Sequence, residues 1–276
     1  MIKVMFLISS IIYTIQFMSG CDVKIIDADN LTYKESNKLY LNVSEIDKIK
    51  KENQKFILKT KQTVYIKDTA ELKLKPGWKL LGDTGEEMVI KESDTTTSAI
   101  KIKNAANIQV KNFQLKMDTY TPTHEKSLIE IDNENAIGNI EIVNMKLSNH
   151  YCGIWAKRGK NIRIDSCLIF ENGHQINLGL IHRDSSQRRK YSVKNVTISN
   201  SQILDSKGGN VNGIKTLSNC TGIKIVNNLI ANNNQDGIDL FPGGLDVEIR
   251  GNTIRDNKVH GIEVKMTSEY PPHQIG

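Results

Sequence analysis

The sequence contains few residues that form disulfides or aromatic stacks, and few of the motifs that bind metals. Only four of its 276 residues are cysteine, and 6% are aromatic. Four cysteines are too few for a disulfide-stapled scaffold, so we expect Cys152, Cys167 and Cys220 to be buried free thiols. The sequence also has no glycine-rich phosphate loop, no cysteine and histidine spacing typical of zinc, and no Ser/His/Asp signature. These absences argue against nucleotide-binding, zinc-dependent and serine-hydrolase chemistry.

What is present is the composition of a globular protein with a small basic excess. Hydrophobic residues make up 38% of the chain, which rules out disorder and an integral membrane protein. The formal charge of +6 hints at an acidic partner: nucleic acid, an anionic lipid surface or an acidic polysaccharide. A charge this small, without stacked aromatic residues, argues against nucleic acid. We therefore expect an acidic polysaccharide as the partner.

The first twenty residues have the pattern of a targeting segment. Lys3 is followed by an apolar run through Phe17, which is too short and too close to the terminus for a spanning helix. The run ends in Phe-Met-Ser-Gly-Cys21, which resembles the lipobox of bacterial lipoproteins. The resemblance implies a signal peptide over residues 1–20, lipid on Cys21, and an exported cell-envelope protein that touches the membrane only through this anchor. The alternative is an ordinary cleaved signal and an extracellular protein.

A short frame recurs along the chain and dominates its organisation. Its first, third and eighth positions are always aliphatic, and its fifth position is Asn, Ser or Gly. The spacings between starts are 32, 22, 34, 27 and 24 residues. The six copies are Ile108–Leu115, Ile140–Leu147, Ile162–Ile169, Val196–Ile203, Ile223–Ile230 and Val247–Ile254.

Each copy predicts a short strand followed by a bend. Alternation over its first three positions is typical of a strand with one buried face. Asn and Gly tolerate left-handed dihedral angles, so the small polar residue bends the chain, and such asparagines can stack into a hydrogen-bonded ladder. A second strand precedes the frame in most coils, and the Gly-Ile pairs that begin at 213, 237 and 261 repeat with a period of 24 residues.

Two or three short strands per coil predict a solenoid of stacked parallel strands. A leucine-rich repeat is the competing fold, but its asparagine follows an apolar position by three residues, whereas here the interval is two. The pattern resembles the right-handed parallel β-helix of the pectin-lyase superfamily, an all-β fold. We expect this domain over 55–276, after an N-terminal tether or cap over 21–54 with a helical period from Val43 to Asn53. No cap follows, so we expect a monomer that lacks its C-terminal coils.

The constant period of 24 residues predicts a polar constellation in the last three coils. Equivalent positions should stack about 4.8 Å apart, with inward and outward side chains alternating. Lys215, Asp239 and Glu263 then share one outward column with Lys265 nearby, and Asn212, Asp236 and His260 stand at the preceding corner. An ordinary charged surface is the alternative. Adjacent like charges at Asp239 and Glu263, however, need a cation between them, either a lysine or calcium.

A family resemblance makes this constellation more specific. The segment Asn234–Phe241 resembles the Asp-Asp-Gly-(Phe/Trp)-Asp-Leu-Phe segment of family-nine pectate lyases, whose aspartates hold calcium. The resemblance implies that Asp236 and Asp239 are metal ligands and that calcium is the cofactor. Gln235 and Val211 stand where that family has further ligands, so the ligand set departs from the family pattern.

The same resemblance leaves the catalytic base open. In that family the catalytic lysine lies in a later Asn-Gly-Phe-Lys segment. Asn212-Gly-Ile-Lys215 has this form but lies one coil before the aspartates, and Lys265 lies in the later coil. Lys215 and Lys265 are therefore alternative bases. Asp236-Gly-Ile-Asp239 and His260-Gly261 also echo polygalacturonase motifs, which keeps a hydrolase as an alternative.

These residues together predict a polysaccharide lyase. Such an enzyme removes the proton α to a uronate carboxylate and expels the 4-linked sugar, so it needs a base and a cation that neutralises the carboxylate. Calcium held by Asp236, Asp239 and Glu263 supplies the cation, and a lysine of lowered pKa supplies the base. The residues expected to bind substrate are Asn212, His260 and Arg183. A glycoside hydrolase, a uronate epimerase and a non-catalytic glycan-binding or structural β-helix remain alternatives, because the fold serves all of them.

Overall fold

The computed structural model describes residues 25–58, 63–67, 70–82, 88–91, 97–120, 126–134, 137–180, 192–217, 219–241 and 245–265. The predicted signal peptide, the lipidation site Cys21 and the substrate contact Arg183 lie outside these residues. Within the described ranges, no helix is both long and apolar enough to cross a membrane.

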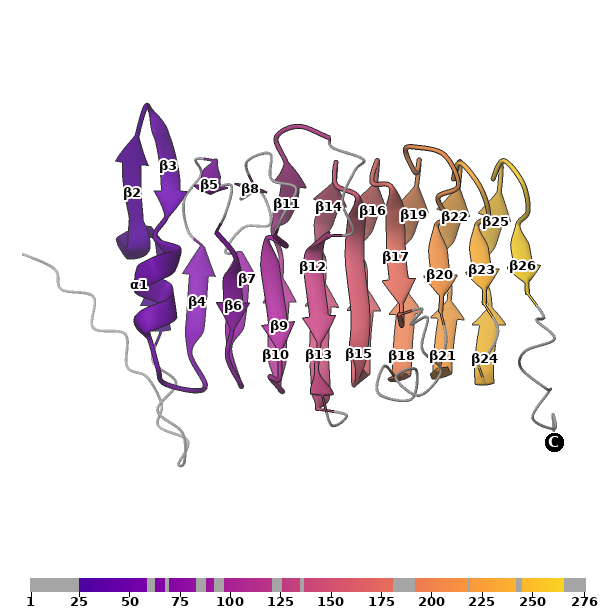
Figure 1. The fold of residues 1–276 in the computed structure, drawn as a ribbon, viewed down its shortest axis with the longest axis horizontal. Coiled ribbons are helices and arrows are strands. Elements are labelled where there is room, and N and C mark those ends of the chain that lie inside the picture. Colours follow the sequence, from indigo (N-terminus) through magenta and orange to yellow (C-terminus); the bar gives the residue numbers. More distant parts are fainter. Residues whose placement is uncertain are drawn as a thin grey trace, which may run out of the picture.

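Short strands stack along one axis into three parallel sheets, and each coil of the chain passes through the sheets in turn (Figure 1). Sheet A consists of β1 (Ile25–Asp27), β4 (Lys55–Leu58), β7 (Lys79–Gly82), β10 (Ile108–Lys111), β13 (Gly138–Val143), part of β15 (Cys152–Asp165), β18 (Val193–Ser199), β21 (Cys220–Val226) and β24 (Leu245–Arg250). Sheet B consists of β2 (Thr32–Glu35), β3 (Lys38–Leu41), β5 (Val64–Ile66), β8 (Met88–Lys91), β11 (Gln114–Met117), β14 (Lys146–Ser148), β16 (Leu168–Phe170), β19 (Gln202–Leu204), β22 (Leu229–Ala231) and β25 (Thr253–Arg255). Sheet C consists of β6 (Leu72–Leu74), β9 (Ile100–Lys103), β12 (Ser127–Asp132), the rest of β15, β17 (His174–Leu178), β20 (Ile214–Thr216), β23 (Ile238–Leu240) and β26 (Ile262–Val264).

The long strand β15 joins two of the sheets. Its first residues pair with β12 and β17 in sheet C, and its last residues pair with β13 and β18 in sheet A. All described pairings are parallel except the β2–β3 hairpin. This architecture confirms the predicted all-β parallel β-helix.

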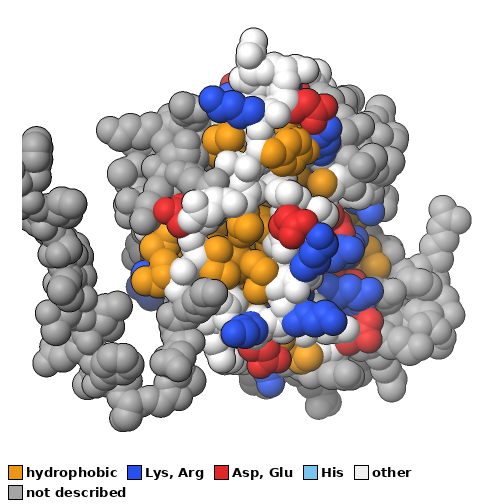
Figure 2. All heavy atoms as spheres, turned by 90° about the vertical axis from the view of Figure 1, so that its left-hand side faces the viewer, with side chains coloured by type: hydrophobic (Ala, Val, Ile, Leu, Met, Phe, Trp, Pro, Cys, Tyr) orange, Lys and Arg blue, Asp and Glu red, His pale blue; other side chains and the backbone are white. Residues whose placement is uncertain are grey.

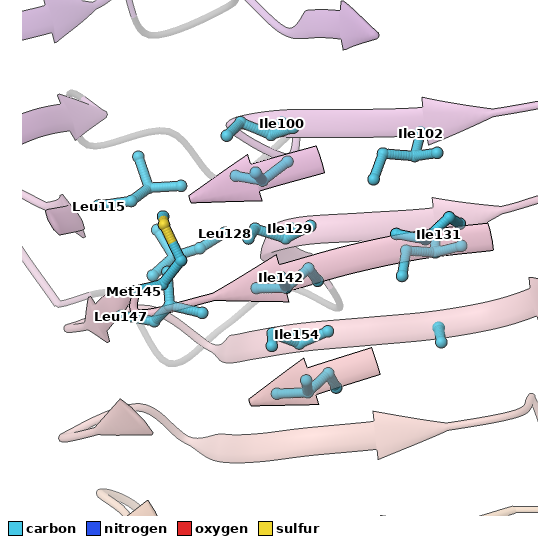
Figure 3. Packing of buried hydrophobic residues seen from close by; sticks show 14 of the residues in the cluster. Ile100, Ile102, Leu115, Leu128, Ile129, Ile131, Ile142, Met145, Leu147 and Ile154 are labelled. Carbon is cyan, nitrogen blue, oxygen red and sulfur yellow. The ribbon is translucent and has the colours of Figure 1, made fainter. Parts of the chain in front are cut away.

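The core is a column of stacked aliphatic side chains. Ile100, Ile129 and Ile154 occupy equivalent positions in successive strands of sheet C and are almost completely buried. Leu115 and Leu147 stack in the same way on sheet B and lie toward this row (Figure 3). Because every coil contributes the same kind of side chain at the same place, one continuous core extends along the solenoid. The three cysteines predicted as free thiols are free and buried.

The predicted bend after each sheet A strand is present in all six copies. The fifth residue of the frame has φ between 51° and 67° at every one of these corners. The predicted ladder of asparagines forms only in part. Asn144 donates to Asn112 at 3.1 Å, but Ser166 interrupts the column, and Asn200 donates to Asp165 instead.

A longer ladder, which the sequence analysis did not predict, lies at the opposite end of sheet A. Asn139 donates to Asn107, Asn161 to Asn139 and Asn195 to Asn161, over 3.0, 3.1 and 3.2 Å. All four residues have left-handed backbone angles. These asparagines therefore turn the chain into sheet A and tie four successive coils together.

The N-terminal end carries the hairpin β2–β3 and the helix α1 (Val43–Lys48) (Figure 1). A 3-10 helix over Ala28–Leu31 precedes the hairpin. The helix stops five residues short of the predicted Asn53, because Ile49 adopts an extended conformation and Lys75 Nζ donates to the Ile49 carbonyl oxygen. Seen from this end, hydrophobic side chains lie centrally with charged side chains beside them (Figure 2). β1 pairs in register with β4, so sheet A already begins at residue 25.

Candidate functional site

The strand register brings the predicted constellation together. Lys215 is the direct neighbour of Asp239, and Asp239 is the direct neighbour of Glu263, on β20, β23 and β26. At the preceding corner, the Asp236 amide donates to Asn212 Oδ1 at 3.0 Å, and the His260 amide donates to Asp236 Oδ1 at 3.2 Å. The two predicted columns are therefore real, because a constant period of 24 residues leaves no offset between these coils.

Asp239 is held by three donors. Its side chain is fully buried, and its Oδ2 lies 3.0 Å from Lys265 Nζ, 3.3 Å from Lys215 Nζ and 3.0 Å from Asn212 Nδ2. Two ammonium groups face this one carboxylate, and one of them, that of Lys265, also pairs with Glu263. This arrangement compensates a charge that would be costly to bury alone.

Asp236 and His260 form a second pair at the corner. Asp236 Oδ1 lies 2.9 Å from His260 Nδ1; the Asp236 side chain is fully buried, and that of His260 is 52% exposed. Burial raises the pKa of Asp236; the His260 contact opposes this rise, and the neighbouring Glu263 carboxylate adds to it. A buried carboxylate thus anchors an imidazole that faces solvent.

Lys265 also bridges the two acidic positions of the column. Its Nζ lies 2.8 Å from Glu263 Oε2 as well as 3.0 Å from Asp239 Oδ2. Burial lowers the pKa of Lys265, but hydrogen bonds to Glu263 and Asp239 outweigh burial, so the net pKa is raised. The hydrogen bond from Lys265 lowers the pKa of Glu263. Lys265 is therefore a stable cation, which is the opposite of what a lysine base needs.

The donor set does not suit calcium well. Calcium prefers six to eight oxygen ligands. Of the three predicted carboxylates, Asp239 is already neutralised by two lysines. The atoms that do converge are one each from Asp236, His260 and Glu263, all within 4.8 Å of one another. This mixed nitrogen and oxygen set differs from the predicted one, and we derive no catalytic step from calcium.

The sequence analysis missed His174, which belongs to the same corner. It lies two residues before Ile176, as Asn212 lies two residues before Ile214, and its Nδ1 accepts the Asn212 amide at 3.2 Å. Burial lowers its pKa to about 4, and the positive charge of Lys215 contributes to this shift. The signal in the sequence was that His174, like Asn212, stands two residues before an isoleucine of its strand. The long coil between His174 and Asn212 obscured this equivalence.

The outward column continues beyond the site along sheet C. The register aligns Lys101, Glu130, Trp155 and Asn177 with Lys215. Glu130 is buried between Lys101 and Lys157, at 3.4 and 3.2 Å. Polar and aromatic side chains thus follow one line across successive coils.

Three sheets, aliphatic interior and polar corners define a parallel β-helix protein. The chain belongs to the family described as the right-handed β-helix region, whose model matches residues 98–271. This match confirms the predicted right-handed β-helix. No curated protein sequence matches the chain.

Several solved structures share the fold at low sequence identity. The Dettilon tailspike protein is 17% identical with a TM-score of 0.61, over 83% of this chain and 42% of that chain. The enzymatically active domain of bacteriophage CBA120 tailspike protein 2 is 12% identical with a TM-score of 0.53, over 84% and 41%. An alginate lyase from Paenibacillus is 15% identical with a TM-score of 0.45, over 76% and 72%. The chain spans less than half of the two tailspike structures, and the likeness to them shows the fold alone.

Proposed function

We propose that this chain is an enzyme that cleaves an acidic, uronate-containing polysaccharide by β-elimination. The observation that carries the proposal is the buried Asp236 carboxylate at 2.9 Å from the half-exposed His260 imidazole, beside two lysine ammonium groups. Base and cation, the two requirements of the reaction, then lie within three successive coils: His260 precedes β26, Lys265 follows β26, and Lys215 lies on β20. The proposal gives the role of base to His260, which the sequence predicted as a substrate contact.

The Asp236–His260 pair suits proton abstraction. An ionised Asp236 can only accept a hydrogen bond, so His260 Nδ1 carries the proton and Nε2 keeps its lone pair. Because the imidazole is anchored at one side and exposed at the other, Nε2 is free to accept the C5 proton of a uronate. The electron pair of the broken C5–H bond forms the C4–C5 double bond as the C4–O bond breaks. The leaving oxygen takes its proton from water.

The lysines suit the neutralisation of the uronate carboxylate. Lys215 and Lys265 share the carboxylate of Asp239, Lys265 also pairs with Glu263, and the pKa of Lys265 is raised. Cations fixed before the substrate arrives stabilise the negative charge that develops during proton abstraction. On this proposal the lysines bind the carboxylate and His260 is the base.

The structural relatives support an enzymatic role on this scaffold. One of the two similar tailspike structures is an enzymatically active domain with the same type of coil. Fold likeness does not determine the chemistry. The proposal therefore rests on the Asp236–His260–lysine cluster.

The test is an absorbance assay with a variant of the base. The protein is mixed with polygalacturonate, alginate and glycosaminoglycans, with calcium and then with a chelator, and the ultraviolet absorbance of an unsaturated uronate is followed. We expect His260→Ala to lower kcat by about 10²–10⁴. Arg255→Ala, at an exposed ion pair of the same coil, is the control and should keep full activity.

The outcomes separate the parts of the proposal. A normal rate for His260→Ala would show that the base lies elsewhere. Loss of activity with chelator would restore a metal to the mechanism. Binding without any product would make the chain a glycan-binding protein, and a change in sugar composition without cleavage would make it an epimerase.

Glycoside hydrolysis is the second candidate, because one observation favours it. The pKa of Asp236 is raised by burial, whereas the pKa of the neighbouring Glu263 is lowered by Lys265. Two adjacent carboxyl groups whose pKa values move apart can serve as acid and base on a glycosidic bond. New reducing ends without ultraviolet absorbance would identify this reaction.

A further inference from the structure

A hollow of 240 Å³ opens beside the candidate site, on the side of His174. It lies between the corner before β17 and the connection from β19 to β20. Its walls are formed by Tyr120, Tyr151, Gly173, His174 and residues 207–211. None of the predictions from sequence placed a ligand there.

We infer that this hollow is a binding subsite for one uronate unit of the polysaccharide, recognised by His174 and Lys207. The inference rests on the proposed function for the class of ligand. It adds a second place of contact, away from the reacting sugar, that selects chain length and charge.

His174 offers the hollow a neutral hydrogen-bond donor. Its Nδ1 accepts the Asn212 amide at 3.2 Å, so in the neutral ring Nε2 carries the proton. His174 is 9% exposed and lines the hollow. Nε2 is then available to donate to a sugar hydroxyl or carboxylate in the hollow.

Lys207 supplies the positive charge at the rim. Its Nζ lies 3.0 Å from Glu171, and both side chains are more than 40% exposed. A surface ion pair of this kind contributes little to stability, so the ammonium group can exchange Glu171 for the carboxylate of a uronate.

Tyr120 supplies the flat wall of the hollow. Its hydroxyl donates to the Lys207 carbonyl oxygen at 2.8 Å, and its ring centroid lies 5.8 Å from Lys207 Nζ. A fixed aromatic face beside a cation and an N–H donor is the combination that binds a ring with an apolar face and a charged edge.

The hollow is connected to the proposed base through the strand order. Asn212 donates its backbone N–H to His174 and its side-chain Nδ2 to Asp239. The strands β17, β20, β23 and β26 are successive neighbours. His174 and His260 are therefore three strand spacings apart, about 14 Å. A chain of pyranose units that runs along the solenoid, with one uronate at His260, can therefore place a more distant unit in the hollow.

The experiment compares oligomers of increasing length. Galacturonate and mannuronate oligomers from dimer to hexamer are titrated into wild type, Lys207→Ala and Gly209→Leu by calorimetry, and kcat/KM is measured on the same series. Gly209 lines the hollow, and a Cβ atom built there meets no atom within 4 Å, so Gly209→Leu should fold and place a larger side chain at the hollow. Lys224→Ala, which removes another exposed ion pair, on sheet A, is the control.

We expect both hollow variants to bind the hexamer at least about tenfold more weakly, with binding of the dimer unchanged. The control should match wild type at every length. Equal hexamer affinity in all four proteins would overturn the subsite. If the variants turn over substrate and their kcat/KM depends on oligomer length as in wild type, the subsite is overturned and the β-elimination proposal stays intact. If no protein turns over substrate, but affinity rises with oligomer length in wild type and not in the variants, the subsite is supported and the lyase is overturned. No binding of any oligomer by wild type would overturn both.

Discussion

At the scale of single residues, the candidate site is defined by how two buried carboxylates are compensated. Asp239 is paired with two lysines, whereas Asp236 is contacted by the backbone amide and the imidazole of His260, which is charged only when protonated. One oxygen of each carboxylate is buried without a hydrogen-bond donor. Such groups destabilise a fold unless they serve a ligand or a reaction. Because, among the described residues, Asp236 has no permanently cationic partner and Asp239 has two, Asp236 and His260 are the pair suited to proton transfer.

His174 leads to a prediction about acid stability. Its pKa is lowered from 6.5 to about 4, mainly by burial and secondly by the positive charge of Lys215. The unfolded chain therefore binds a proton between these pH values that the folded chain does not, and stability falls as the pH drops through this window. We expect a loss of about 3 kcal/mol in unfolding free energy between pH 7 and pH 4 from this residue.

The measurement is urea unfolding of wild type and His174→Gln at both pH values. The difference between the two proteins isolates His174 from the other titrating groups. If the variant loses as much stability as wild type on acidification, His174 is not buried as a neutral ring.

At the scale of elements, the asparagine corners determine how coils stack. Asn139 has φ 63°, donates to Asn107 and accepts from Asn161. Asn139→Gly keeps the left-handed backbone and removes only the ladder bonds, and should cost about 1–2 kcal/mol. Asn139→Ala removes the same bonds and adds left-handed strain, so it should cost about 1 kcal/mol more.

Chemical unfolding of the two variants checks this prediction. Asn53→Gly and Asn53→Ala, at a left-handed position outside the ladder, are the matched controls and isolate the strain. Equal stability of Asn139→Ala and Asn139→Gly would mean that the backbone angle does not contribute.

The sequence predicted those features that recur from coil to coil. The aliphatic frame placed the core, and the spacing of 24 residues placed Lys215, Asp239 and Glu263 in one column. The long coil before Asn212 broke this period, so His174 was not recognised as its neighbour. The sequence left open whether a lysine or calcium lies between Asp239 and Glu263, because the register fixes where Cα atoms lie but not which way a long side chain reaches. In the structure Lys265 contacts both carboxylates.

At the scale of the whole molecule, stability is a sum over neighbouring coils, because each coil contacts only those beside it. β15 pairs with β12, β17, β13 and β18, and most of its side chains are buried. β26 pairs only with β23 among the described strands, and its Ile262 and Val264 are 44% and 64% exposed. The candidate site therefore bridges well-packed coils and the least packed of the described coils.

Amide hydrogen exchange should reveal this gradient. We expect slow exchange in β12, β15 and β18, and progressively faster exchange from β20 to β26, because local opening costs less where fewer strands pair. Since His260 lies in the least packed of the described coils, binding of an acidic oligosaccharide should slow exchange most in β23 and β26. Uniform protection along the chain would instead show that the solenoid opens only as one unit. In that case the packing of the last coil would have no bearing on how the site binds its ligand.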